Sequence, residues 1–460
     1  MRMRRRPARL VLLAAVPFLC LPVGPGLSGQ VPFTEESSML PDGTLYRIRV
    51  PDPWNGTLLR DLDYAGRADN AFGLNMLERG YAMAGTQRHE LRAFQYDPQR
   101  EITNLDLVLD RFEDRFTAPD RVIQYGCSGG GHVTIAVAED YSSRIDGAIA
   151  LGAHHPVWLM NTFLDGWFAL QVLIAPELPV VDLPFQSSGG TAHGVEGEIP
   201  TRWREAINGA QATPEGRARI ALAATLGQWP AWSTRLVSMP ELDDPYSLQH
   251  SLYHNLYDRY AANPGGEARI MFESAAQGRQ LSWNESVDYR AWFEDGNPAF
   301  RAAVARLYQD AGLDLATDLD RLNEAPRVTA SPHALEFWGK PGRNTVGVPK
   351  IPLLRLHEVG DFQVPLSLVS GYDDLIEANG KQDLYRTAFV EAPTHCGFNV
   401  AEAVSAVETM MVRLDAGEWP ETGPEALNRV GEALGTDDTP RFIDPTQYRP
   451  AKYNRVWVPN

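Results

Sequence analysis

Residues 126–130 read Gly-Cys-Ser-Gly-Gly, which fits the pattern Gly-x-Ser-x-Gly. The run at 122–125 before them is apolar and strand-like, and residues 132–141 after them fit a helix. In this context the pattern predicts a strand-to-helix turn so tight that side chains two positions to either side of Ser128 would not fit. Such a turn exposes the hydroxyl and brings the Gly129 N–H close to it, where it can stabilise an oxyanion. A nucleophilic serine is our interpretation, and a glycine-rich turn without chemistry is the alternative.

A serine hydroxyl needs a base to remove its proton and an acid to orient that base. After a turn of this kind the expected chain order is serine, acid, histidine. Asp361 follows an apolar run at 351–356 and His395 follows another at 387–391, so strand-end loops would bring both to Ser128. We therefore predict Asp361 as the acid and His395 as the base. Three other carboxylates compete for the role of the acid: Glu358, Asp373 and Asp374.

Two of the three cysteines flank the predicted nucleophile and base. Cys127 immediately precedes Ser128, and Cys396 immediately follows His395. If the serine and the histidine come within hydrogen-bond reach, their neighbours fall within the Cα separation of about 4.4–6.8 Å that a disulfide requires. We therefore expect a disulfide between Cys127 and Cys396 that holds the base near the nucleophile. Two buried free thiols, or Cys127 itself as the nucleophile, are the alternatives.

The first 29 residues have the layout of a secretory signal peptide. Five arginines precede an apolar run at 10–23, and small residues follow at 24–29. The run is shorter than the about 20 residues of a membrane-spanning helix. The mature protein is therefore expected to be secreted or periplasmic, without a transmembrane segment, and either general or twin-arginine export fits. Cys20 would leave with the peptide, because no small residue precedes it as lipoprotein processing requires.

The charge balance argues against nucleic acid as a partner. The 460 residues include 59 Asp and Glu against 42 Lys and Arg, a formal net charge of -17. The glycine patterns that bind nucleotide phosphates do not occur. His154 and His155 are adjacent but lack the further ligands of a metal site, and His132 follows Ser128 too closely to serve as its base. We expect neither a metal nor another cofactor.

Strand-like and helix-like segments alternate over 44–151 and again from residue 351, which is typical of an α/β architecture. The stretch between them lacks this alternation and holds eight of the 11 tryptophans. We predict one unit, 30–158 with 347–460, that forms a mostly parallel sheet with helices on both faces. Residues 159–346 would form a large, mostly helical insertion. Its tryptophans either line a site that the insertion covers or pack its own core.

The chain order Cys-Ser, Asp, His-Cys resembles the arrangement of the tannase and feruloyl esterase family. Residues 54–56, Trp-Asn-Gly, and 64–66, Tyr-Ala-Gly, also resemble the N-terminal segment of that family. The resemblance implies a secreted α/β-hydrolase fold in which a disulfide joins the two cysteines. It also implies a substrate-binding lid at 159–346 and a second oxyanion N–H at Asp63 or Tyr64.

The chain also departs from that family. No cysteines remain for the further disulfides that the family carries. Asp314, Asp318 and Asp320 fit one face of a helix better than the oxygen ligands of a calcium loop. Residues 60–63, Arg-Asp-Leu-Asp, do not reproduce the glycine-rich oxyanion loop. We interpret the chain as a divergent relative, so the substrates of the family are not carried over.

Together these features predict a secreted serine hydrolase that acts on carboxylic esters. Ser128 would attack the ester carbonyl, His395 would carry the proton, Asp361 would orient His395, and an acyl-enzyme would then be hydrolysed. Phenolic or other bulky esters, small or linked to a polymer, would suit the tryptophan-rich insertion. An exported peptidase or amidase is the alternative, because the same groups cleave amides. A non-catalytic binding protein on this scaffold is disfavoured, since all three residue types of the triad are present.

Overall fold

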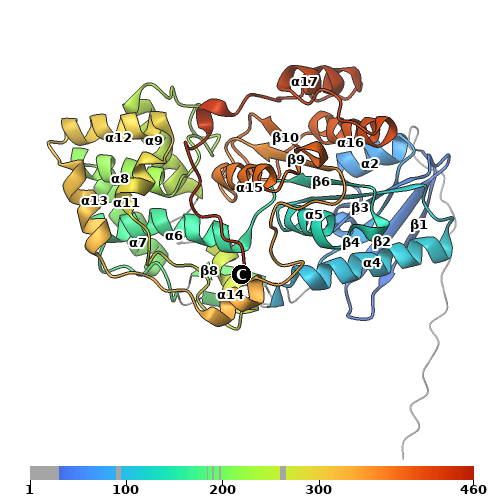
Figure 1. Cartoon of the computed structure of the whole chain (residues 1–460), viewed down its shortest axis with the longest axis horizontal. Coiled ribbons are helices and arrows are strands. Elements are labelled where there is room, and N and C mark those ends of the chain that lie inside the picture. Colours follow the sequence, from blue (N-terminus) through green and yellow to red (C-terminus); the bar gives the residue numbers. More distant parts are fainter. Residues whose placement is uncertain are drawn as a thin grey trace, which may run out of the picture.

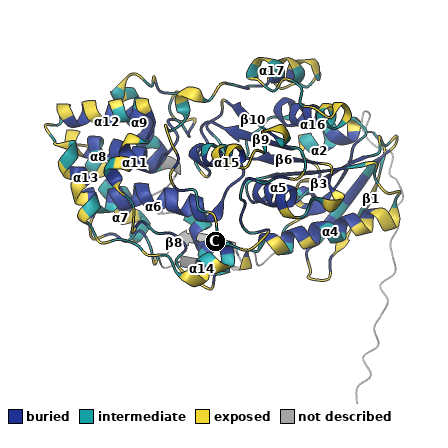
Figure 2. Cartoon of the chain, in the orientation of Figure 1, coloured by how far each residue is buried: buried dark blue, intermediate teal, exposed yellow. Residues whose placement is uncertain are grey.

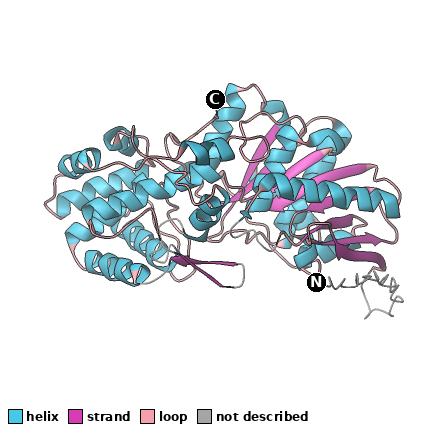
Figure 3. Cartoon of the chain, turned by 90° about the horizontal axis from the view of Figure 1, so that it is seen from below, coloured by secondary structure: helices cyan, strands magenta, loops and turns pink. Residues whose placement is uncertain are grey.

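The computed structural model describes residues 31–89, 95–183, 185–188, 191–195, 198–259 and 266–459. The expected signal peptide, 1–29, lies outside the described residues. One lobe is built on a large sheet and the other consists almost wholly of helices, as Figures 1 and 3 show. In the part of the chain that the structure describes, no helix is both long and apolar enough to cross a membrane.

Eight strands form the central sheet, in the order β1-β2-β4-β3-β5-β6-β9-β10. β1 and β2 pair antiparallel, β2 is antiparallel to β4, and the six strands from β4 to β10 are parallel. β4, β6 and β9 are buried along their whole length, as strands covered on both faces should be. The predicted mostly parallel sheet is confirmed. The bounds are β1 (Phe33–Met39), β2 (Leu45–Pro51), β3 (Thr57–Asp61), β4 (Ala82–Thr86), β5 (Arg121–Cys127), β6 (Gly147–Leu151), β9 (Leu353–Glu358) and β10 (Tyr385–Val390).

Helices cover both faces of this sheet (Figure 1). α4 and α5 enclose one core, which receives Leu58 of β3, and α2 and α16 enclose the other, which receives Leu59. Neighbouring residues of a strand point to opposite faces, so each inner strand supplies both cores. The helices of this lobe are α1 (Tyr64–Arg67), α2 (Ala71–Glu78), α4 (Pro98–Arg115), α5 (Gly129–Asp140), α15 (Ser367–Ala378), α16 (Val400–Ala416) and α17 (Pro424–Ala433).

The chain leaves the sheet after β6 and returns to it at β9, the next strand in the sheet. The segment between them forms the helical lobe, in which α6 is buried on nearly every side and packs against α8 (Figure 2). A small hairpin of two strands, β7 and β8, belongs to the same segment. The elements are α6 (Pro156–Leu173), β7 (Phe185–Ser188), β8 (Thr191–Val195), α7 (Ile199–Gln211), α8 (Pro214–Leu226), α9 (Pro245–His254), α10 (Gly266–Ala275), α11 (Tyr289–Glu294), α12 (Pro298–Asp310), α13 (Leu315–Glu324) and α14 (Pro332–Trp338).

The tryptophans of the helical lobe mostly pack its own core. Trp167 of α6 lies with its ring centroid 5.0 Å from that of Trp203 and 6.2 Å from that of Trp229, and all three are buried. A helical lobe without a sheet needs large apolar side chains to fill the space between its helices. The tryptophan-rich composition therefore reflects packing, and it does not by itself indicate a bulky substrate.

The C-terminal tail connects the two lobes. Arg455 forms a buried ion pair with Asp165 of α6, with Nε and Oδ2 2.9 Å apart. The carbonyl of Trp457 accepts a hydrogen bond from the indole N–H of Trp158, which is also in α6. Because both partners in the ion pair are buried, the loss of one would leave the other charge without compensation. The tail therefore fixes α6 beside the carboxyl ends of the sheet strands.

Candidate active site

The predicted strand-to-helix turn lies between β5, which ends at Cys127, and α5, which begins at Gly129. Ser128 occupies the turn with φ 59° and ψ -119°, a left-handed conformation that is uncommon for a residue with a Cβ atom. A Cβ atom on Gly126 would lie 2.7 Å from the carbonyl carbon of Gly130. The glycine lets the backbone approach this closely, which is the physical reason for the spacing in the sequence.

His395 and Asp361 lie in direct contact at the carboxyl ends of two neighbouring strands. Nδ1 of His395 is 2.7 Å from Oδ2 of Asp361. The other oxygen of Asp361 accepts the backbone N–H groups of Gln363 and Val364, each at 2.9 Å, and these bonds fix the carboxylate. Nε2 of His395 is buried and has no hydrogen-bond partner among the described residues. This arrangement leaves Nε2 available as a general base.

The competing carboxylates have other roles in the structure. Glu358 accepts a short hydrogen bond from the Thr394 hydroxyl and another, at 3.0 Å, from the Gly397 N–H. It therefore holds the loop that carries the histidine. Asp373 forms an ion pair with an arginine of the C-terminal tail, and Asp374 is exposed. Of the four candidate acids, Asp361 is the one whose carboxylate contacts His395.

Cys127 and Cys396 form the disulfide that the sequence predicts. Their Cα atoms lie 6.0 Å apart, and the bond joins positions separated by 269 in the chain. A Cβ atom on Gly152, just after β6, would lie 3.4 Å from Oδ2 of Asp361 and 3.5 Å from Sγ of Cys127. The same atom would lie 3.6 Å from Cε1 of His395. The ends of β5, β6 and β9 therefore converge on one place, and the disulfide ties the loop of the histidine to the serine turn.

Of the two amides expected to supply the second oxyanion donor, one is already engaged. The N–H of Asp63 donates to Oδ1 of Asp61 at 3.0 Å, in a turn just after β3. This local bond is an Asx-type turn, which an Asp-x-Asp sequence favours. The Asp63 amide is thus engaged within its own loop, and Tyr64 is the first residue of α1. The second oxyanion donor, at Asp63 or Tyr64, stays a prediction.

Arg88 lies at the same site, although no sequence motif marks it. It follows β4 by two residues, has φ 44°, and forms two hydrogen bonds to the carboxylate of Asp63, at 2.5 and 2.6 Å. A Cβ atom on Gly129 would lie 2.8 Å from Nη1 of Arg88. The guanidinium therefore lies beside the predicted oxyanion donor. The one sequence signal for such a residue is its position after a parallel strand that ends at the same sheet edge.

The surroundings of His395 favour its protonated form. Burial lowers the pKa of His395, but the charge and hydrogen bond of Asp361 outweigh this, with a further contribution from Glu358, and the pKa lies above its usual value of 6.5. Burial, together with the charge of Asp361, raises the pKa of Glu358 to about 7. A base must be unprotonated to act, so catalysis should increase as the pH rises through the pKa of His395.

We expect kcat/KM to show an acid limb with its midpoint above pH 6.5, and Glu358→Gln to move that midpoint to lower pH. The substitution removes the part of the negative charge that Glu358, with its pKa of about 7, carries near His395 at these pH values. It keeps an oxygen that accepts from Thr394 and Gly397. The pH dependence of kcat/KM for the two proteins measures the shift. Asp374→Asn, which removes an exposed charge, is the matched control and should leave the midpoint unchanged. A Glu358→Gln midpoint that stays in place or rises would contradict this account of His395.

The other histidines of this region are structural. Burial lowers the pKa of His132 to about 4, and its Nδ1 lies 3.0 Å from the carbonyl oxygen of His154. His155 bonds Thr345 through Nδ1 at 2.6 Å, and its ring stacks on Trp158 with centroids 4.3 Å apart. Over the described ranges, no three His, Cys, Asp or Glu side chains come together as metal ligands would.

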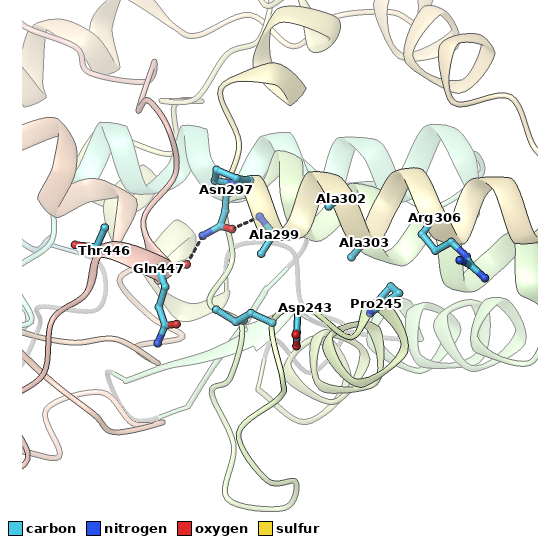
Figure 4. Close-up of a pocket in the computed structure, with 11 residues that line it drawn as sticks. Asp243, Pro245, Asn297, Ala299, Ala302, Ala303, Arg306, Thr446 and Gln447 are labelled. Atoms are coloured by element: carbon cyan, nitrogen blue, oxygen red, sulfur yellow. Dashed lines mark hydrogen bonds between the residues drawn. The ribbon is translucent and has the colours of Figure 1, made fainter.

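Figure 4 shows a cavity of 690 Å³ in the helical lobe, whose lining includes none of the residues of the predicted triad. α12 and the start of α9 form its walls, and the C-terminal tail closes one side at Thr446 and Gln447. Asn297 caps α12 and also donates to the carbonyl of Gln447 at 2.9 Å, so the wall on this side is fixed. Few charged groups reach the cavity. It offers none of the nucleophile, base or acid of the other site.

Comparisons with known proteins show one relative that covers almost the whole chain. The chain is 52% identical over 450 residues to o-phthalyl amidase from Xanthobacter agilis. The alignment spans 95% of this chain and 99% of the relative. No family model matches.

Among solved structures, feruloyl esterase B from Aspergillus oryzae matches 86% of this chain and 83% of its own, with 11% identity and a TM-score of 0.42. The tannin acyl hydrolase from Aspergillus niger matches 84% and 79%, with 12% identity and a TM-score of 0.39. The sheet order and the serine turn already give the fold, and the relative gives the family. The chain therefore belongs to one family with the o-phthalyl amidase of Xanthobacter agilis and is a hydrolase of the α/β type.

Proposed function

We propose that this protein is a serine hydrolase that cleaves the amide bond of an aromatic acyl group. The contact between His395 and Asp361, with Nε2 of His395 left without a partner among the described residues, is the observation that carries the proposal. The relative that is 52% identical, in an alignment that covers 95% of the chain, is named o-phthalyl amidase. This identity favours an amide over the ester that the sequence motifs alone suggested.

The proposed reaction gives each of the three residues one role. Ser128 Oγ attacks the acyl carbon while Nε2 of His395 takes its proton, and the carboxylate of Asp361 stabilises the imidazolium that forms. The Gly129 N–H, at the N-terminus of α5, donates to the oxyanion. His395 then protonates the leaving amine, the carbon–nitrogen bond breaks, and water releases the acid from Ser128 by the reverse proton transfers.

Esters of the same acid should form the same acyl-enzyme. An alkoxide or phenoxide is a better leaving group than an amine, which must be protonated before it departs. An esterase and an amidase built from this triad therefore differ in how well His395 delivers a proton to the leaving atom. This makes ester cleavage a second expected activity of the site.

A matched pair of substrates, the anilide and the phenyl ester of one aromatic acid, tests the proposal. We expect the purified protein to release aniline and phenol at measurable rates, and Ser128→Ala to release neither above background. Phenol release without aniline release would show an esterase. Failure to release either product from a range of aromatic acyl substrates would favour the alternative of a binding protein on a hydrolase scaffold.

We also propose that residues 1–29 direct export and are removed. The apolar run at 10–23 supports this proposal. The N-terminal residue of protein recovered from the producing cells tests it, since a mature chain that still begins at Met1 would contradict it.

We propose further that residues 159–346 act as a lid over the sheet edge. The position of this segment between β6 and β9 supports the proposal. If it holds, deletion of the lobe should abolish discrimination among acyl groups.

A further inference from the structure

Arg88 places a charged group next to the reacting atoms that the proposed mechanism does not use. Nη1 would lie 2.8 Å from a Cβ atom on Gly129, and Nη2 would lie 3.7 Å from one on Gly130. These two residues form the first turn of α5, directly after Ser128. The guanidinium therefore lies beside the residue whose N–H is the predicted oxyanion donor.

The hydrogen bonds of Arg88 leave one end of the guanidinium available. Nε and Nη2 donate to the two oxygens of Asp63, and Nη2 also approaches the Cys127 carbonyl at 3.5 Å. Nη1 has no hydrogen-bond partner among the residues that the structure describes. A guanidinium has five N–H groups, and its planar edge matches the two oxygens of a carboxylate. An arginine already held by one carboxylate is thus oriented to bind a second one.

The backbone around Arg88 also departs from relaxed geometry. Arg88, Ser128 and Cys396 each have a left-handed φ, at 44°, 59° and 56°, and all three belong to the same site. Residues with a Cβ atom adopt this conformation at a cost, and such residues cluster where a protein must aim a functional group. Asp63 tightens the arrangement, because its pair with Arg88 joins the loops after β3 and β4. The guanidinium is therefore positioned in advance of any ligand.

An aromatic cluster lies next to the guanidinium. The hydroxyl of Tyr96 would lie 3.2 Å from a Cβ atom on Gly129, on the same side as Arg88. The ring of Tyr96 is 5.7 Å from that of Phe272, which lies 5.1 Å from the ring of His154. All three rings are buried. The buried rings exclude water from this side of the guanidinium, and surroundings of low dielectric strengthen its attraction for a carboxylate.

We propose that Arg88 binds a carboxylate on the acyl group and so selects aromatic amides whose scissile carbonyl has a carboxylate on the neighbouring ring position. This inference rests on the proposed function and adds the group that determines specificity. The carbonyl oxygen would lie at the Gly129 N–H and the carboxylate at Nη1 of Arg88, which are neighbours in the structure. Arg88 would then be a binding residue for substrate, and the ion pair with Asp63 would serve to orient it.

The test compares one variant on two substrates, 2-carboxybenzanilide and benzanilide. Arg88→Gln should lower kcat/KM for the carboxylated anilide by about 10- to 100-fold, the range for a lost hydrogen bond to a charged group, and should leave benzanilide within about threefold. Arg88→Gln with Asp63→Asn removes both charges, so that no carboxylate is left unpaired, and should show the same selective loss. Arg219→Gln is the matched control, because it breaks an arginine pair with Asp318 in the helical lobe. Its two rates should match those of the unaltered protein.

A binding measurement separates this inference from the proposed function. Phthalate and benzoate are titrated calorimetrically into Ser128→Ala, with and without Arg88→Gln. We expect Arg88→Gln to weaken phthalate at least tenfold more than benzoate. Equal losses for both ligands, equal losses for both anilides, or no loss would overturn the role of Arg88 and leave it as a structural clamp on the turn. If Ser128→Ala still hydrolysed the anilides, the proposed mechanism would fail, but the dependence of phthalate binding on Arg88 would remain decisive.

Discussion

Ser128→Ala is expected to lower kcat by about 10⁶-fold, the effect of removing the nucleophile from a serine triad. We expect this loss because Ser128 occupies the left-handed turn between β5 and α5, and Nε2 of the candidate base has no hydrogen-bond partner among the described residues. His395→Ala should cause a loss of similar size. The double variant should be no worse than either single variant, because the two residues act as one unit.

Steady-state hydrolysis of an aromatic anilide measures these losses, with circular dichroism to show that each variant folds. Ser143→Ala is the matched control, since this serine is exposed just after α5 and should leave kcat unchanged. A Ser128→Ala protein with more than about one hundredth of the original kcat would contradict the assignment, because the residual rate without a nucleophile should be far smaller.

The second large effect concerns the disulfide. Replacing Cys127 and Cys396 with alanine should lower the free energy of unfolding by up to about 5–6 kcal/mol, the chain-entropy estimate for a closed loop of this length. The same change should lower kcat by up to about 100-fold, because the bond holds the histidine loop against the serine turn and small displacements in such a pair are costly. Either single replacement should equal the double one, since each breaks the same bond.

Urea unfolding and anilide hydrolysis test both parts of this prediction. Treatment of the unaltered protein with reductant under conditions that break the bond should reproduce the phenotype of the variants, and reductant should not affect the double variant further. If the double variant kept full stability and full kcat, the bond would have no role in positioning His395. If the two single variants differed from each other, a free thiol would contribute in its own right.

The serine turn and its partners could be predicted because local rules determine them. The turn requires glycine at position 126, where a Cβ atom would lie 2.7 Å from the Gly130 backbone. A Cβ atom on Gly130 would meet only ordinary contacts at 3.6 Å or more, so the second glycine of the pattern is not required in the same way. Asp361 could be chosen over Glu358 because it follows a strand end, while Glu358 is the last residue of β9. The cysteine positions then supported the pairing of two loops that are distant in the chain.

The features that sequence reasoning missed depend on tertiary contacts. Arg88 acquires its place from the pairing of β3 with β4 and from Asp63, and no local pattern records such a contact. The engaged amide of Asp63 is a local feature, since Asp61 precedes it by two residues. The expected oxyanion donor at Asp63 or Tyr64 came instead from the resemblance to a family whose loop has a different sequence there. The buried tryptophans show a third limit, because composition cannot distinguish a core from a binding surface.

Covalent trapping of the nucleophile tests the central claim most directly. The folded protein is treated with a fluorophosphonate, digested, and analysed by mass spectrometry alongside Ser128→Ala. The account predicts one adduct, on the peptide that contains Ser128, and none on the variant. An adduct on another residue, or an unlabelled Ser128 in protein that hydrolyses its anilide, would contradict it.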